Sequence, residues 1–128
     1  MIVDSSALIA VVLEEPHAVT FLTKMLQAAS LSVSAVTLTE ASMVLLSRGG
    51  QVKVEILDAL LERLEVKVVP VDRTQSLLAR EAFDRYGKGR AKACLNLGDC
   101  FAYALAKQHG EPLLFQGNDF VYTDLLLA

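Results

Sequence analysis

Four carboxylates adjoin apolar segments that are typical of buried strands or of helix starts. They are Asp4, Glu40, Asp99 and Asp119. In an open α/β fold the carboxyl ends of the strands form the edge of the sheet where sites are placed. At about 5 Å and an effective dielectric near 20, each pair of such charges repels by roughly 3 kcal/mol. A divalent cation removes this repulsion, and Mg²⁺ and Mn²⁺ prefer oxygen ligands. The sequence therefore predicts an acidic metal site that acts on phosphate.

Each acid taken alone also has a simpler interpretation. Asp4 could cap a helix or form an Asx turn. Glu40 shares a largely apolar helix face, where it could instead pair with an arginine. Asp99 could satisfy the amides of a first helical turn, and Asp119 could belong to an ordinary turn. Their common position relative to the predicted strand ends, and not any single acid, supports the metal site.

Other chemistries have weaker support in the sequence. No phosphate-binding loop, dinucleotide-binding glycine motif or Gly-x-Ser-x-Gly elbow is present. Cys94 and Cys100 lack a zinc-site spacing, and His17 and His109 lack a nucleophile motif. A receiver-like regulatory domain would need a second acid close to Asp4, which is followed by serines.

Composition and patterning indicate one domain spanning 1–128. The chain has 128 residues, of which 53% are hydrophobic and 21% charged, as in a compact globule. Its net charge of −3 gives no general attraction for nucleic acid, so such a partner would need a local basic patch. No apolar run approaches the roughly 20 residues that span a bilayer, and no leader pattern precedes one. We expect a cytoplasmic protein with no membrane contact.

Apolar runs that alternate with amphipathic segments predict an α/β fold with a mostly parallel sheet of four to five strands flanked by helices. Strands are expected at 1–4, 31–34, 66–71 and 112–115, with a short edge strand at 123–128. Helices are expected at 7–13, 18–29, 35–47, 52–64, 73–86 and 99–109. Ser5 or Ser6 is the expected cap of the first helix, and Ser34 is the expected cap of the helix at 35–47. Glu14-Glu15-Pro16 has the composition of a helix start, from which the helix continues through 18–29. Right-handed crossovers would bring the carboxyl ends of the strands to one edge.

Four segments occur in an order that resembles the PIN-domain family, and more narrowly the VapC-type toxins of bacterial toxin–antitoxin pairs. The segments are Val3–Leu8, Ser34–Glu40, Leu95–Lys107 and Leu113–Phe120, so the resemblance spans the chain. The stretch around Asp99 is its most specific part. The resemblance implies a PIN-like fold and a metal-dependent endoribonuclease that is inhibited by a small antitoxin encoded with it.

The resemblance also implies roles for individual residues. Asp4, Glu40 and Asp99 match the acids of the family's metal site. Many members carry the fourth acid where this chain has Gly117, so that Asp119 is expected to take this role, with Asp124 as the alternative. A second departure lies at Ala91-Lys92, where relatives often have His-Pro.

We hypothesise that these acids hold one or two Mg²⁺ or Mn²⁺ ions and that a metal-activated water cleaves RNA, leaving a 5′-phosphate and a 3′-hydroxyl. Asp4 and Asp99 would be the principal ligands. Glu40 and Asp119 would complete the site, with Glu40 orienting the attacking water. The expected supporting donors are Ser5, Ser6 and Asn118.

Positive charge for an RNA substrate is concentrated in and just before the loop that precedes Asp99. The cations are Arg85, Lys88, Arg90 and Lys92. They predict a phosphate clamp beside the metal site, and the alternative is a solvated surface loop.

The helices at 35–47 and 52–64 carry more apolar surface than a small sheet needs. Part of it is expected to form a homodimer contact and part a groove for the antitoxin, unless all of it is core. Two other functions are compatible with the acids: a metal-dependent DNA nuclease or phosphatase, and a non-catalytic Mg²⁺-binding regulatory α/β module.

Overall fold

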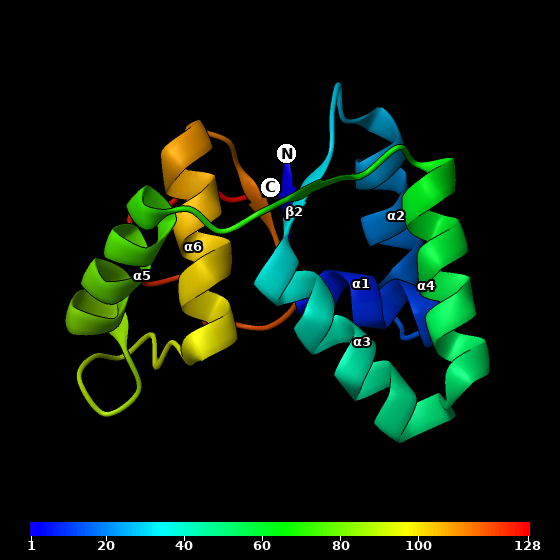
Figure 1. The fold of residues 1–128 in the computed structure, drawn as a ribbon, viewed down its shortest axis with the longest axis horizontal. Coiled ribbons are helices and arrows are strands. Elements are labelled where there is room, and N and C mark those ends of the chain that lie inside the picture. Colours follow the sequence, from blue (N-terminus) through cyan, green and yellow to red (C-terminus); the bar gives the residue numbers. More distant parts are fainter.

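A four-stranded parallel sheet lies at the centre of the computed structural model, which describes all residues from Met1 to Ala128 (Figure 1). Its strands are β1 (Ile2–Val3), β2 (Ser32–Ser34), β3 (Lys67–Val69) and β4 (Leu113–Leu114), in the order β3-β2-β1-β4. Every neighbouring pair is parallel. The predicted α/β fold with a parallel sheet is therefore confirmed, with four strands.

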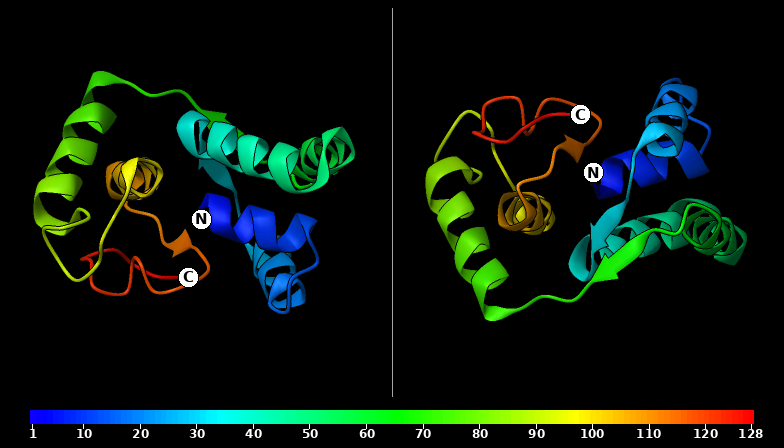
Figure 2. Two further views of the ribbon diagram at one scale, coloured as in Figure 1. Left: turned by 90° about the horizontal axis from the view of Figure 1, so that it is seen from below. Right: turned by 90° about the horizontal axis from the view of Figure 1, so that it is seen from above.

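Six helices cover the two faces of this sheet. They are α1 (Ser5–Val12), α2 (Ala18–Gln27), α3 (Ala35–Gly49), α4 (Gln51–Arg63), α5 (Arg73–Tyr86) and α6 (Leu97–His109). Figure 2 shows α5 and α6 on one side of the sheet and the first four helices on the other. None of these helices is both long enough and apolar enough to cross a membrane.

Two hydrophobic clusters form the core because successive strand residues point to opposite faces. Val3 and Leu114 pack into the cluster of the first four helices. Their neighbours Ile2 and Leu113 pack into the cluster of α5 and α6. Both faces of β1 and β4 are thus buried, which explains their uninterrupted apolar sequences.

Polar side chains at the strand–helix junctions determine where the helices begin. Asp4, and not the predicted Ser5 or Ser6, caps α1 by accepting from the Ser6 amide. Ser34 caps α3 as predicted. Helix α6 begins two residues earlier than expected, because Asn96 caps it in a capping box.

Two predicted elements differ from the structure. Glu14-Glu15-Pro16 does not start a helix, since Glu14 adopts a left-handed φ of 56° and α2 begins only after His17. The segment 123–128 is not a regular strand. It makes a single parallel bridge, between Leu127 and Leu113, so the fifth strand is reduced to one point of pairing.

Candidate functional site

Asp4 lies at the point where β1 passes into α1. Its carboxylate is buried, with 2% exposure. Oδ2 accepts from the Ser6 amide at 3.0 Å and from the Ser6 hydroxyl at 2.6 Å. Oδ1 is buried and has no hydrogen-bond partner. Burial, together with the nearby Glu40 charge, raises the pKa of Asp4 above its usual range.

Asp99 occupies the first turn of α6 and is 7% exposed. Its Oδ2 accepts from the Asn96 amide at 3.0 Å, while its own amide donates to Asn96 Oδ1 at 2.9 Å. Burial raises the pKa of Asp99 to about 7, and the charges of Asp4, Asp119 and Glu40 act in the same direction. The structure therefore brings the four predicted acids within electrostatic range of one another. We refer to Asp4, Glu40, Asp99 and Asp119 as the acidic cluster.

Glu40 reaches the acidic cluster from α3. Its Oε1 accepts from the Ser5 hydroxyl at 2.5 Å. The carboxylate lies directly against Gly98 in α6, where an added Cβ would overlap the Glu40 carboxylate oxygens. None of the ion pairs in the structure involves Glu40, so the alternative of a buried pair with arginine is not realised. Gly98 thus permits the close approach of α6 to the Glu40 side chain.

In three of these acids one carboxylate oxygen accepts a hydrogen bond from a neighbouring donor, and the other oxygen accepts none from the protein. The held atoms are Asp4 Oδ2, Glu40 Oε1 and Asp99 Oδ2. No three Asp, Glu, His or Cys side chains are close enough together to enclose an ion. A hydrated Mg²⁺ does not need such a cage, because it commonly keeps several waters and takes one or two carboxylates. The orphaned Asp4 oxygen and the repulsion at Asp99 fit an ion of that kind.

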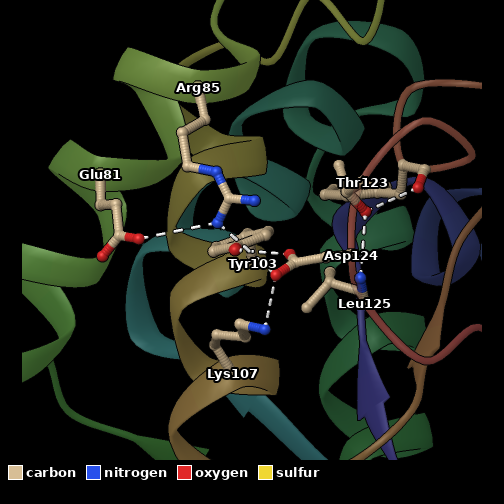
Figure 3. A network of polar contacts seen from close by, with 8 residues as sticks. Glu81, Arg85, Tyr103, Lys107, Thr123, Asp124 and Leu125 are labelled. Carbon is tan, nitrogen blue, oxygen red and sulfur yellow. Dashed lines mark hydrogen bonds and ion pairs between the residues drawn. The ribbon is translucent and has the colours of Figure 1, made fainter.

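Asp119 and Asp124 have different surroundings. Asp119 lies in an exposed turn, and its charge is among those that raise the pKa of Asp99. Asp124 is held at 2.7 Å by both the Tyr103 hydroxyl and the Lys107 ammonium, with Arg85 at 3.5 Å (Figure 3). Burial acts to raise the pKa of Asp124, but the hydrogen bonds from Lys107 and Tyr103 outweigh it and lower the pKa to about 2. Asp124 therefore connects the C-terminal segment to α5 and α6. We call Asp124 with its partners Tyr103, Lys107 and Arg85 the Asp124 network.

The four predicted basic residues do not form one open patch. Arg85 is paired with Glu81 at 3.6 Å as well as with Asp124, which gives it a structural role. Arg90 pairs with Asp84 at 3.0 Å and lies over the ring of Phe83. Lys88 and Lys92 are exposed and form no ion pair with a carboxylate. Lys92 lies 4.7 Å from the centroid of the Tyr122 ring.

The supporting donors are partly as predicted. Ser5 and Ser6 both donate to acids of the cluster. The Asn118 side chain makes no hydrogen bond to any of them, and its backbone oxygen accepts from Val121.

Three further residues shape the acidic cluster. Gln116 donates its amide to the Ser6 hydroxyl at 2.9 Å and its side chain to Glu15 at 2.7 Å. Asn96 orients Asp99, and Gly98 makes room for Glu40. The Asn-Leu-Gly-Asp spacing from Asn96 to Asp99 is typical of a capping box, so the sequence could have indicated the pairing of Asn96 with Asp99. No local pattern marks Gln116, because its partners are more than 100 positions away.

Comparison with known proteins identifies the family. The family model described as PIN domain matches residues 1–125, which is nearly the whole chain. The chain therefore belongs to the PIN-domain family.

Similar sequences are VapC proteins. A protein named ribonuclease VapC from Mycolicibacterium smegmatis is 43% identical over 98% of this chain and 97% of its own length. Ribonuclease VapC30 from Mycobacterium tuberculosis is 42% identical over 98% of this chain and 95% of its own. The resemblance to VapC-type proteins is thus confirmed over the full chain.

Solved structures with the same fold are more distant in sequence. VapC20 from Mycobacterium tuberculosis, described as a sarcin–ricin loop cleaving toxin, matches with a TM-score of 0.82 at 18% identity, covering 99% of this chain and 97% of that one. VapBC2 from Rickettsia felis, bound to a promoter DNA fragment, matches with a TM-score of 0.77 at 14% identity, covering 99% and 96%. At these identities the likeness shows the fold alone.

Proposed function

We propose that this chain is a metal-dependent endoribonuclease and the toxin of a toxin–antitoxin pair. The observation that carries the proposal is the gathering of four acids, from four separate parts of the chain, at one place in a PIN-domain fold. The full-length similarity to proteins named ribonuclease VapC supports RNA as the substrate.

Mg²⁺ or Mn²⁺ is the proposed cofactor, and Asp4 and Asp99 are its proposed principal ligands. Asp4 would use its unpartnered Oδ1, and Asp99 the oxygen that does not accept from Asn96. When bound, such an ion supplies Lewis-acid activation of a phosphodiester and of water. Ser6 and Asn96 hold the two carboxylates in fixed orientations and leave the other oxygen of each one free to bind an ion.

Glu40 is the proposed residue that orients the attacking water. Its Oε1 is fixed by Ser5, which leaves Oε2 to accept a hydrogen bond from a water molecule. Asp119 comes from an exposed turn and would complete the site when substrate and ion are present. The expected products are a 5′-phosphate and a 3′-hydroxyl.

Contacts with the RNA backbone are assigned to Lys88 and Lys92, because no carboxylate neutralises either of them. Arg90 is a weaker candidate because Asp84 already pairs with it. An acidic protein needs such local positive charge to hold a polyanion beside its own carboxylates.

The proposed antitoxin site is a groove between α3 and the start of α6. It has a volume of about 610 Å³, and its apolar lining includes Val36, Met43, Val44 and Leu97. Glu40 also lines it, so a basic antitoxin side chain lying in the groove would reach the acidic cluster. This arrangement would couple antitoxin binding to inhibition.

A homodimer is the proposed assembly. Val52 and Ile56 of α4 remain exposed at 64% and 43%, and Leu46 of α3 is exposed as well. A patch of this kind on adjoining helices is typical of a protein contact. Light scattering at several concentrations should give twice the mass of the chain, and a strictly monomeric protein would contradict the dimer.

The central experiment is cleavage of a panel of structured and single-stranded RNAs by antitoxin-free protein. We expect cleavage with Mg²⁺ or Mn²⁺, none with EDTA, and none by Asp99→Asn. Asp124→Asn serves as the matched control, since it removes an acid outside the cluster. Cleavage of single-stranded DNA but not RNA, or equal rates for wild type and Asp99→Asn, would contradict the proposal.

A further inference from the structure

An exposed aromatic ring lies on the same turn as Asp119. Tyr122 is 50% exposed, whereas Tyr103 is buried and donates its hydroxyl to Asp124. Only two residues lie between Asp119 and Tyr122, so their Cα atoms are at most about 11 Å apart. A large aromatic ring is therefore presented to solvent on the turn that carries Asp119, one acid of the cluster.

The backbone on both sides of Tyr122 is firmly anchored. Phe120 is buried and packs edge-on against Phe115, with ring centroids 5.1 Å apart. On the other side, Thr123 donates to the Phe120 carbonyl and Asp124 is held by its network. The backbone that carries Tyr122 is therefore fixed on both sides, and its ring is half exposed at the surface.

A cation from a different part of the chain lies over this ring. The Lys92 ammonium is 4.7 Å from the Tyr122 ring centroid and has no carboxylate partner. Lys92 belongs to the loop that leads into Asn96 and Asp99, so the pair joins the two loops that flank the acidic cluster. One side of the pair offers an aromatic surface, and the other offers an unneutralised positive charge.

A second cation–aromatic pair provides an internal comparison. Arg90 lies 5.3 Å from the ring centroid of Phe83, which is 42% exposed. However, Arg90 is also paired with Asp84 at 3.0 Å, so its charge is already neutralised. Only the Lys92–Tyr122 pair has both a stacking surface and free positive charge.

We propose that Tyr122 and Lys92 form a binding site for one unpaired nucleotide of the RNA, beside the bond that is cleaved. The nucleobase stacks on the Tyr122 ring, and the Lys92 ammonium moves to the adjoining phosphate. This inference rests on the proposed function and adds to it a substrate class: RNA whose bases are unpaired next to the cleavage site, since bases inside a duplex cannot reach the ring.

The test measures binding separately from cleavage. Fluorescein-labelled oligoadenylate is titrated in EDTA, both as a single strand and annealed to oligouridylate. Tyr122→Ala should weaken single-strand binding about five- to a hundredfold and leave duplex binding unchanged. Tyr122→Trp should restore it, and Lys92→Gln should reduce the slope of log affinity against log salt by about 0.7. Phe83→Ala is the matched control and should bind as wild type does.

Several results would overturn the nucleotide site: an unchanged affinity in Tyr122→Ala, an equal loss on the duplex, an equal loss in Phe83→Ala, or no binding of the single strand by wild-type protein. The cleavage assay with Mg²⁺ or Mn²⁺ distinguishes this failure from failure of the proposed function. Cleavage by wild type with normal binding by Tyr122→Ala would refute the nucleotide site alone. A specific loss in Tyr122→Ala without any wild-type cleavage would support the site and refute the nuclease.

Discussion

Asp99 belongs to α6 and Asp124 binds the same helix from outside, yet their environments act on them in opposite ways. Asp99, in the first turn of α6, is buried among like charges, and its pKa is raised to about 7. Asp124 binds Tyr103 and Lys107 further along α6, and its pKa is lowered to about 2. The charged form of one aspartate therefore opposes folding, while that of the other favours it. A carboxylate that destabilises the fold is the one expected to have a function, since perturbed acids concentrate at functional sites.

The strongest way to test this contrast is to neutralise Asp99. Asp99→Asn should lower RNA cleavage by at least about a hundredfold, because loss of a ligand should exceed the effect of losing a supporting residue. The same variant should unfold at a higher temperature than wild type in EDTA at pH 8, because a repelled buried charge is gone. Thermal unfolding and single-turnover cleavage provide the two measurements. Asp124→Asn should instead cleave RNA at the wild-type rate and unfold at a lower temperature than wild type.

Gly98→Ala tests whether the position of Glu40 matters independently of its charge. The added methyl would overlap the Glu40 carboxylate, the flexible end of a side chain that can move aside. We expect about a tenfold loss of cleavage, as for other residues that orient a ligand. Stability should be unchanged or higher, because alanine suits a helix better than glycine by about 0.5–1 kcal/mol.

Gly49→Ala is the control for this change. It also lies in a helix, and its new methyl would meet the side chain of Lys53, away from the acidic cluster. Equal losses of cleavage in the two variants would show that the position of Glu40 is not what Gly98 protects.

Asp99 and Asp124 should contribute to the pH dependence of stability in opposite senses, and Asp4, whose pKa is also raised by burial, acts in the same sense as Asp99. The native form holds the Asp99 proton more tightly than the unfolded chain does, so this contribution to the free energy of unfolding declines as pH rises from about 4 to about 7. Asp124 contributes in the opposite sense, and its contribution is lost as pH falls from about 4 to about 2. Urea titrations in EDTA across this range check both. A decline between pH 4 and 7 that persists unaltered in Asp99→Asn would exclude Asp99 as its source.

The smallest expected effect is that of Tyr103→Phe. It removes the buried hydroxyl that donates to Asp124 and leaves the ring in place. The free energy of unfolding should fall by about 1 kcal/mol, the typical net contribution of one hydrogen bond. The effect stays this small because Asp124 is partly exposed and can bind water instead. Cleavage should stay close to the wild-type rate. A large loss of activity would mean that the Asp124 network also controls the turn that carries Asp119.

Much of the fold could be predicted from local patterns. Periodicity, together with residues such as Ser34 that cap helices, predicts the six helices and the four strands. The prediction is wrong where one local signal competes with another. Glu14-Glu15-Pro16 has the composition of a helix start, but the left-handed φ of Glu14 delays the helix to Ala18. The apolar chain end has the composition of a strand, but it pairs at Leu127 only.

The candidate site was less predictable in its details. Asp4, Glu40, Asp99 and Asp119 could be chosen because each adjoins a predicted strand end or helix. Arg85 could not be distinguished from Lys92 by composition, although the structure pairs one with Asp124 and leaves the other without a carboxylate. Ion pairs between distant segments leave no periodic trace in a sequence.

Most elements and the order of the acids follow from local sequence, because caps, turns and apolar periodicity depend on residues that are close together in the chain. Three features arise only from tertiary packing: which oxygen of each acid accepts a hydrogen bond, the contact of Gly98 with Glu40, and the place of Asp124 in a stabilising network. It also placed Gln116 beside Ser6, 110 positions away. These contacts join residues through the packing of the sheet and helices, so their effect on burial and charge appears only when the chain is folded.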